Sequence, residues 1–410
     1  MSRILVYTSP ARGHLYPLVP TLEELSRRGH HVAVRTLASE VGRVRALGFP
    51  AEATDPGIEA LAHEDWKATS APAALLAGCR TFVARARHEV SDLRRAIEVE
   101  RPEVLFTDVN CWGAAAAAEV SGLPWATFAP YFLPVRAPGV PPWGLGLAPA
   151  RGVAGRLRDA LLWPVVDRLY DRVLPALNEL RASAGAPPLR HVSDFAARAP
   201  LVVSYTAEPF EYPRAWPSNV RLVGPGIWEP REESEPPRGG VGRPLVLVTC
   251  STEFQNDGRL VAAALAALAG EPVRVVVTTA SLDPRSFEAP ANAVVERFLP
   301  HGPLLREAAC VVCHGGMGIT QKALAAGVPV CVVPFGRDQL EVARHVVEAR
   351  AGTRLLPGRL DPERLRAAVR TAMSRAEGAG RLAEAFRRAG GAAAAADALE
   401  SIGTEERARP

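Results

Sequence analysis

The chain has 410 residues, with 48 Lys and Arg against 44 Asp and Glu and a formal net charge of +4. Its 48% hydrophobic and 22% charged residues exclude a disordered or fibrous protein, and its scattered Arg residues form no basic stripe that would bind nucleic acid. The length is sufficient for two or three domains, each with its own core.

The N-terminal segment predicts a unit of strand, helix and strand. An apolar run over residues 3–8 is typical of a strand, and a loop over residues 9–16 follows it. Pro17 suits the first turn of a helix that Gly29 ends, and residues 31–36 form the next strand. The first apolar run is too short for the core of a signal peptide, so we expect a cytoplasmic protein.

The same alternation continues in the first half of the chain. A strand over residues 104–107 ends at Asp108, an Ala-rich helix follows, and residues 125–128 form another strand. This alternation indicates a parallel sheet covered by helices on both faces. The longest uncharged stretch, residues 120–135, contains three prolines and cannot span a membrane as a helix, so we expect no membrane partner.

A polar stretch rich in Pro and Gly, residues 229–243, is typical of a linker between domains. We therefore predict two α/β domains with Rossmann-like, doubly wound sheets, residues 1–228 and 244–410, that face each other across a cleft. The Ala-rich segment 382–399 predicts a terminal helix, which we expect to be able to pack back on the first domain.

After the linker, the pattern of strands and helices restarts and runs through two further units. Their expected strands are residues 245–249, 273–278, 310–313 and 328–333. Their expected helices are residues 258–269 and 319–326.

The six cysteines lie mostly in apolar runs, which is typical of reduced cysteines in a core. Cys310 and Cys313 with His314 match the C-x-x-C-H signature of haem attachment, and C-x-x-C alone matches a redox motif. Haem attachment requires export, and we expect no export signal. A zinc site requires a second pair of ligands at similar spacing, which the sequence lacks. A buried strand that ends in a functional turn is therefore favoured. The chain has no D-x-D pair, and we expect no catalytic metal.

In doubly wound sheets, functional residues lie in the loops after the strands. His14 follows the first strand beside Gly13 and is a candidate general base, although a histidine hydrogen-bonded to the backbone is an alternative. Asp108 ends a strand at the same edge of the same sheet. Its carboxylate could orient the His14 ring and stabilise its protonated form.

The strongest local signal is residues 314–318 (HGGMG), between an expected strand and an expected helix. The glycines let the backbone approach a ligand closely, and the N–H groups at the helix start suit phosphate oxygens. A tight turn without a ligand is the alternative, but it leaves His314 unexplained. Asp338 and Gln339 offer acceptors and a donor for sugar hydroxyls, or a cap for the next helix. The hydroxyls of residues 249–252 could reach a phosphate.

Together these segments resemble the family 1 glycosyltransferases with the GT-B fold, over nearly the whole chain. Residues 13–17 (GHLYP) and 24–32 (ELSRRGHHV) look like the opening motif of that family, and residues 314–329 (HGGMGITQKALAAGVP) look like its nucleotide-sugar signature. Residues 249–255 and 335–344 are most similar to actinobacterial antibiotic glycosyltransferases, including those of enediyne and macrolide pathways.

The resemblance implies a role for each matching residue. His14 would take the proton of the acceptor hydroxyl, with Asp108 as its partner. The other matching residues would bind the nucleotide-sugar. The diphosphate would be held by His314, Gly315, Gly316, Met317 and Gly318, with help from Ser251 or Thr252. The base would be held by Phe298 and Leu299, and the sugar by Asp338 and Gln339.

Two departures from the family pattern concern the donor. Many relatives with common hexose donors carry Glu near the position of Gln321 or Lys322, and many have Gln where this chain has His301. These differences favour a thymidine diphosphate (dTDP) deoxysugar over UDP-glucose.

The acceptor site is expected in the first domain. The loop over residues 131–147 is apolar and rich in Pro, and an amphipathic helix follows it, which suits a large hydrophobic aglycone. Four aromatic side chains of this region would contact the aglycone, or else pack in the core or a lid. They are Tyr131, Phe132, Trp143 and Trp163.

The expected function is therefore metal-independent, inverting transfer of a deoxysugar from a dTDP-sugar to a hydroxyl of a natural-product aglycone in antibiotic biosynthesis. We expect no cofactor besides this co-substrate, and a monomer or a homodimer. Two alternatives are a non-hydrolysing nucleotide-sugar epimerase and an inert auxiliary subunit of a glycosyltransferase complex. The apolar acceptor loop argues against the epimerase, and the presence of His14, Asp108 and residues 338–339 argues against the inert subunit.

Overall fold

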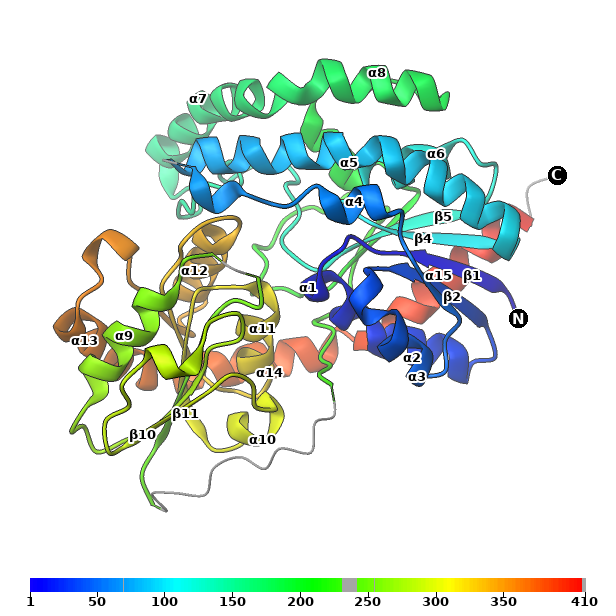
Figure 1. Ribbon diagram of the computed structural model, residues 1–410. Helices are drawn as coiled ribbons and strands as arrows, with labels where there is room; N and C mark the ends of the chain where they lie inside the picture. Colours follow the sequence, from blue (N-terminus) through cyan, green and yellow to red (C-terminus); the bar gives the residue numbers. More distant parts are fainter. Residues whose placement is uncertain (69, 231–241, 254, 408–410) are drawn as a thin grey trace.

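The computed structural model describes residues 1–68, 70–230, 242–253 and 255–407. Two α/β domains lie next to each other, each with one parallel sheet between layers of helices (Figure 1). This confirms the predicted fold class. Most of the predicted linker, residues 231–241 of 229–243, lies outside the described residues.

The first sheet has seven parallel strands in the order β3-β2-β1-β4-β5-β6-β7. They are β1 (Arg3–Tyr7), β2 (His31–Thr36), β3 (Ala51–Ala53), β4 (Val104–Asp108), β5 (Trp125–Ala129), β6 (Leu201–Ser204) and β7 (Val220–Leu222). The central strands are buried on both faces, which explains why they read as continuous apolar runs. The strand order reverses between β1 and β4, so a crevice opens beyond their carboxyl ends.

The helices of the first domain cover both faces of this sheet (Figure 1). They are α1 (Arg12–Leu15), α2 (Val19–Arg27), α3 (Val41–Ala46), α4 (Pro56–Ala60), α5 (Ala71–Glu100), α6 (Trp112–Glu119), α7 (Gly152–Tyr170) and α8 (Leu174–Ala184). Helices α5 and α6 touch through their backbones, because a Cβ at Gly113 would lie 1.9 Å from the carbonyl oxygen of Ala86. No helix among the described residues is long and apolar enough to cross a membrane.

The second sheet has six parallel strands in the order β10-β9-β8-β11-β12-β13, and it reverses between β8 and β11. The strands are β8 (Leu245–Thr249), β9 (Arg274–Thr278), β10 (Ala293–Glu296), β11 (Ala308–Cys313), β12 (Val330–Val332) and β13 (Gly352–Arg354). The helices around it are α9 (Gly258–Leu268), α10 (His301–Leu305), α11 (Met317–Ala325), α12 (Gln339–Glu348) and α13 (Pro362–Met373). Cys310 and Cys313 lie buried in β11, and all six cysteines are free.

Three expected boundaries were wrong. Residues 12–15 form α1 instead of part of a loop, so His14 lies on a short helix that continues through a 3₁₀ turn into α2. Helix α11 begins at Met317, two residues early, because Gly316 takes the N-cap position. The Ala-rich segment forms parts of two helices, α14 (Ala376–Arg388) and α15 (Gly391–Arg407). The chain turns between them at Gly390 and Gly391, whose φ angles are +91° and +56°.

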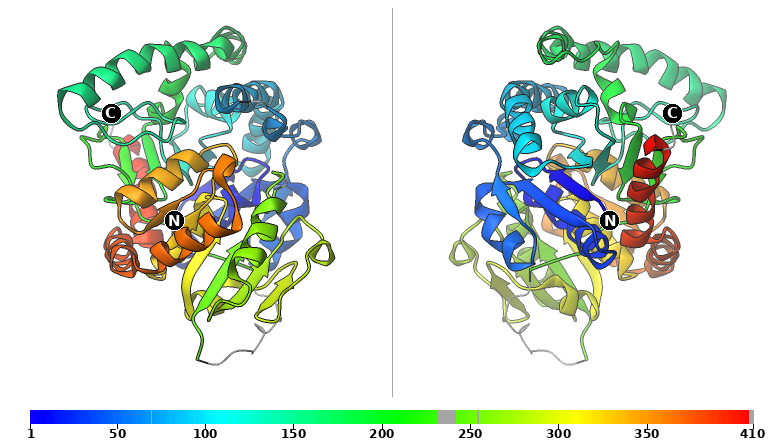
Figure 2. Two further views of the ribbon diagram at one scale, coloured as in Figure 1. Left: turned by 90° about the vertical axis from the view of Figure 1, so that its left-hand side faces the viewer. Right: turned by 90° about the vertical axis from the view of Figure 1, so that its right-hand side faces the viewer.

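Helix α15 lies on the first domain, beside α2 and β6 (Figure 2). Its Ala395, Ala396 and Leu399 are buried in the same apolar cluster as residues of β1, β2 and β4. Arg28 reinforces this contact with ion pairs to Asp397 and Glu400 at 2.6 and 2.9 Å. The last helix therefore completes the core of the first domain.

Shortening Leu399 should destabilise the protein through that core. Leu399 is 1% exposed, and Leu399→Ala should reduce the free energy of unfolding by about 2–5 kcal/mol through lost burial and the cavity left behind. The urea midpoint of unfolding measures the loss. Leu157→Ala, at a helical position that is 59% exposed, is the matched control and should leave the midpoint nearly unchanged. Equal midpoints for the two variants would contradict the docking of α15.

Candidate active site

One cavity of about 730 Å³ lies between the domains, at the edges where both sheets reverse. Residues after β1, β4 and β5 form its wall on the first domain, and residues after β8, β11 and β12 form its wall on the second. The predicted site residues can therefore be placed on one or the other wall.

His14 and Asp108 lie in direct contact on the first wall. His14 Nδ1 is 2.8 Å from Asp108 Oδ2, and this oxygen also accepts the backbone N–H of Ser9 at 3.1 Å. Asp108 is fully buried, whereas His14 keeps part of its ring exposed to the cavity. Because a carboxylate can only accept, Nδ1 carries the proton and Nε2 keeps its lone pair. This is the geometry of an oriented base.

The pKa of His14 reflects opposing effects. Burial lowers it, but the negative charge and hydrogen bond of Asp108 raise it, with further help from the charges of Glu253 and Asp338. The pKa is raised overall above the ordinary histidine value. His14 can therefore act as a base only above that raised pKa.

Sequence reasoning missed Asn110, which follows Asp108 by two residues. The Asn110 Nδ2 atom lies 3.4 Å from His14 Nε2, and Asn110 Oδ1 accepts the hydroxyl of Tyr131 at 2.6 Å. Asp108 Oδ1 accepts the backbone N–H of Asn110 at 2.8 Å. Its place just beyond the end of a strand was the one signal that could have identified it.

The second wall carries the glycine-rich turn. A Cβ at Gly315, which has φ +93°, would lie 2.7 Å from Val332, so the turn requires glycine there. His314, Gly316, Met317 and Gly318 line the cavity at the start of α11. The first N–H groups of a helix have no intrahelical partners, so this wall can bind an anion.

His314 is not a source of positive charge in this site. Burial lowers its pKa to about 4, and the charge of Arg337 contributes in the same direction. The neutral imidazole can still donate one N–H to a phosphate oxygen. Positive charge on the cavity walls comes instead from four side chains: Arg12, Arg85, Lys322 and Arg337.

The other residues expected to contact the nucleotide differ in their access to the cavity. Thr252 is exposed and lines the cavity, while Ser251 lines it with a hydroxyl that accepts the side-chain amide of Gln255 at 2.8 Å. Phe298 is 39% exposed and also lines the cavity. Leu299 is buried in the core of the second domain, so its side chain is unavailable to a base and only its backbone could take part.

Asp338 and Gln339 begin α12 at the cavity. The carboxylate of Asp338 makes no cap hydrogen bond, and burial raises its pKa. Gln339 is 1% exposed, and its Oε1 accepts the backbone N–H groups of Phe335 and Gly336 at 2.7 and 3.0 Å. Asp338 is thus presented to a ligand, whereas much of the Gln339 amide holds the preceding loop in place.

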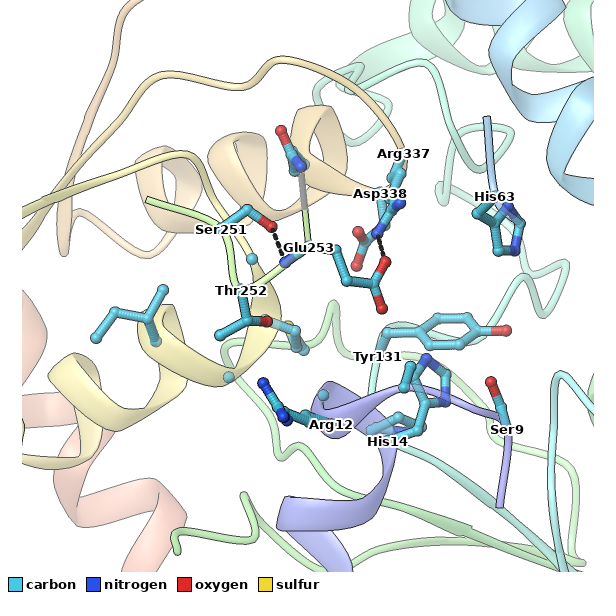
Figure 3. Close-up of a pocket in the computed structure, with 18 of the residues that line it drawn as sticks. Ser9, Arg12, His14, His63, Tyr131, Ser251, Thr252, Glu253, Arg337 and Asp338 are labelled. Carbon is cyan, nitrogen blue, oxygen red and sulfur yellow. Dashed lines mark hydrogen bonds and ion pairs between the residues drawn. The ribbon is translucent and has the colours of Figure 1, made fainter. Parts of the chain in front are cut away.

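A group of charged residues near Asp338 bridges the domains. Arg337 donates to Glu253 at 2.6 Å and, through two nitrogens, to Asp65 of the first domain at 3.1 and 3.3 Å. In Figure 3 the Arg337–Glu253 pair lies opposite His14 and Tyr131. Nothing in the sequence pattern linked Asp65 to this site, because it meets Arg337 across 272 positions.

The four aromatic residues expected at the acceptor site divide into two pairs. Tyr131 and Trp143 line the cavity. Phe132 stacks on His345 with ring centroids 3.8 Å apart, and Trp163 lies 4.5 Å from the guanidinium carbon of Arg136. Neither lines the cavity, so these two side chains fit the alternative interpretation as packing residues.

The rest of the apolar wall comes from helix α5, which sequence reasoning did not consider. Side chains three or four residues apart on one face of α5 line the cavity, which is the spacing of a single helical face. They are Leu75, Gly78, Cys79 and Phe82. His63, Trp66 and Tyr170 complete this wall. The spacing alone could have indicated a buried face, but not a ligand.

Known proteins resemble this chain in sequence over most of its length. Residues 259–395 match the family model "Erythromycin biosynthesis protein CIII-like, C-terminal domain". The chain is 35% identical over 390 residues to 4'-demethylrebeccamycin synthase of Lentzea aerocolonigenes, covering 91% of this chain and 92% of that protein. The chain belongs to the family 1 glycosyltransferases. It is therefore a transferase, as predicted.

Solved structures support the fold of this glycosyltransferase. The calicheamicin glycosyltransferase CalG4 superposes with a TM-score of 0.77 at 24% identity over 100% of both chains. The Streptomyces sp. SF2575 glycosyltransferase SsfS6, solved in complex with thymidine diphosphate, has a TM-score of 0.70 at 18% identity over 98% of this chain and 100% of that one. The GT-B architecture is thus confirmed.

Gln321 and Lys322, near which the sequence departs from the family pattern, lie in different surroundings in the structure. Gln321 is buried and donates to the carbonyl oxygen of Tyr205 in the first domain at 2.9 Å. Lys322 lines the cavity of this glycosyltransferase and pairs with Glu229 at 3.1 Å. Glu229 also accepts the backbone N–H of Gly302 at 2.7 Å. The carboxylate of Glu229 therefore reaches this part of the cavity.

A larger side chain at Gly78 should obstruct the apolar wall of the cavity, where we expect the acceptor to bind. A Cβ there would meet only His63, at 3.7 Å, and a longer side chain would extend into the cavity. Gly78→Leu should raise the acceptor KM by at least about tenfold and leave the donor KM nearly unchanged. Steady-state kinetics with each substrate varied measures both. Gly42→Leu on α3, where a Cβ meets no atom within 4 Å, is the control. An unchanged acceptor KM would place the acceptor elsewhere.

Proposed function

We propose that this glycosyltransferase moves a deoxysugar from a dTDP-sugar to a hydroxyl of a hydrophobic natural-product aglycone, with inversion and without a metal. One observation carries the proposal. An oriented histidine base on the first domain and an anion-binding helix terminus on the second face the same cavity. Nucleophile and leaving group can therefore lie on opposite sides of a sugar placed between them.

In the proposed step, the acceptor oxygen attacks the anomeric carbon while its proton passes to His14 Nε2. The bond from that carbon to the diphosphate oxygen breaks, and the diphosphate leaves with the electron pair. The N–H groups at the start of α11 and the neutral His314 stabilise the charge that develops on it. Asp108 stabilises the imidazolium that forms on His14.

The substrate classes are supported by the walls of the cavity and by the relatives. The side chains of α5 with Tyr131 and Trp143 form an apolar surface for a large aglycone. SsfS6 was solved with thymidine diphosphate, and the relative from Lentzea aerocolonigenes is 4'-demethylrebeccamycin synthase. The two departures from the family pattern, near Gln321 or Lys322 and at His301, favour a dTDP-sugar over UDP-glucose.

A panel of dTDP- and UDP-sugars, each with and without aromatic and macrolide aglycones, tests the proposal. Release of dTDP should depend on the acceptor, persist in EDTA, and give a product whose anomeric configuration, read by NMR, is opposite to that of the donor. Retained configuration would refute inversion, and loss of activity in EDTA would refute metal independence. Epimer formed without acceptor would support an epimerase, which the relatives do not favour. Binding without turnover of matched substrates would support an auxiliary subunit.

A further inference from the structure

We propose that Asn110, held in place by Tyr131, binds the acceptor oxygen and presents it to His14. Asn110 would thus be a further catalytic residue and Tyr131 a positioning residue that acts through it. This inference rests on the proposed transfer to a hydroxyl. It is carried by a chain of side chains in contact, from Tyr131 through Asn110 and His14 to Asp108.

The carboxylate of Asp108 holds both His14 and Asn110 in place. Asp108 Oδ2 holds the ring of His14 at 2.8 Å, and Asp108 Oδ1 holds the backbone of Asn110 at 2.8 Å. Asn110 has little freedom as a result, since its backbone is bonded and its side chain is nine-tenths buried. Histidine and amide are therefore placed relative to each other by the same residue.

The orientation of the amide follows from the protonation of its neighbours. His14 donates from Nδ1 to Asp108, so its Nε2 carries a lone pair and must face a donor. The Asn110 Nδ2 atom satisfies this at 3.4 Å, and the Tyr131 hydroxyl, donating to Oδ1 at 2.6 Å, holds the amide in that orientation. The reversed amide would place its oxygen against the lone pair of His14.

The long Nδ2–Nε2 contact is the place where an acceptor hydroxyl can enter. In the structure the Asn110 amide N–H faces the lone pair of the base at 3.4 Å, near the limit of a hydrogen bond. A hydroxyl oxygen placed between them accepts from Asn110 and donates its own proton to His14. As this proton moves to Nε2 and the oxygen bonds the anomeric carbon, the amide N–H stays on the same oxygen.

Tyr131 is suited to the positioning role. Burial raises the pKa of its hydroxyl well above the usual value, and the charges of Asp108 and Asp338 raise it further, so it remains a donor. Its ring lies edge-on to His14 with centroids 6.0 Å apart and packs against Trp143 at 6.2 Å (Figure 3). Packing on two sides therefore holds the ring of Tyr131, and this fixes the position of its hydroxyl.

The test compares three variants by steady-state kinetics and by the pH dependence of kcat/KM. Asn110→Ala should lower kcat by about ten- to hundredfold, and Tyr131→Phe by about three- to tenfold, with the donor KM nearly unchanged. Asn110→Asp places a carboxylate against Nε2 and should move the pH midpoint of kcat/KM upward by about one unit. An unchanged midpoint would contradict the contact between residue 110 and His14 Nε2.

Tyr212→Phe is the matched control for Tyr131→Phe. The Tyr212 hydroxyl is buried without a hydrogen-bond partner among the described residues, and its ring stacks on His345 outside the cavity. Thermal unfolding and dTDP binding establish that each variant is folded. Wild-type kcat in folded Asn110→Ala and Tyr131→Phe would overturn the inference. Failure of the wild type to release dTDP in an acceptor-dependent way would instead refute the proposed function.

Discussion

Replacing His14 with Ala is expected to lower kcat by about a hundredfold to ten-thousandfold and leave dTDP binding nearly unchanged. The variant loses the lone pair that is proposed to take the acceptor proton, whereas the proposed diphosphate site lies on the second domain around His314 and α11. Acceptor-dependent dTDP release gives kcat, and titration calorimetry gives the Kd of dTDP.

His191 provides a matched control for this experiment. It forms a pair with Asp171 at 2.7 Å, half-exposed and outside the cavity, so His191→Ala removes an equivalent histidine–aspartate contact. That variant should keep wild-type kinetics. Turnover in His14→Ala within a few-fold of the wild type would show that another group is the base.

Asp108→Asn is expected to have the second largest effect. An amide nitrogen facing His14 Nδ1 would donate to it, which moves the ring proton to Nε2 and removes the lone pair from the reacting side. The kcat should fall by about a hundredfold or more, by analogy with the orienting carboxylate of catalytic triads. Asp171→Asn, which alters the pair outside the cavity, is the control.

The same variant has a predictable pH dependence. In the wild type the rate is lost as pH falls through the raised pKa of His14, so the midpoint of kcat/KM should lie above the ordinary value of about 6.5. Without the charge of Asp108, burial dominates and lowers the pKa, so the midpoint of the residual activity should move to lower pH. A midpoint that stays at the wild-type value would show that His14 is not the titrating group.

The sequence was sufficient to predict elements that depend on local pattern. Buried parallel strands appear as short apolar runs, so the central strands were predicted within two residues at each end. The pairing of His14 with Asp108 followed from topology, because both lie beyond neighbouring strands at the reversal of the sheet. The long signature motifs were sufficient to predict the glycosyltransferase family.

The remaining site residues depend on tertiary contacts that no local pattern encodes. Asp65 reaches Arg337 only because the domains approach each other, and the face of α5 lines the cavity only because of how the helix lies over the sheet. Composition alone also cannot separate aromatic side chains that line a cavity from those that pack. Tyr131 and Phe132 are adjacent in sequence, yet one faces the cavity and the other stacks on His345.

The return of α15 to the first domain affects the order in which the protein can mature during synthesis. The core beside β1 and β4 lacks Ala395, Ala396 and Leu399 until the ribosome has made the second sheet and α14, which precede these residues in the chain. The first domain therefore cannot reach its final stability before the second domain has emerged. For the same reason, a chimaera that exchanges the first domain between relatives must take residues 391–407 from the same parent as residues 1–228.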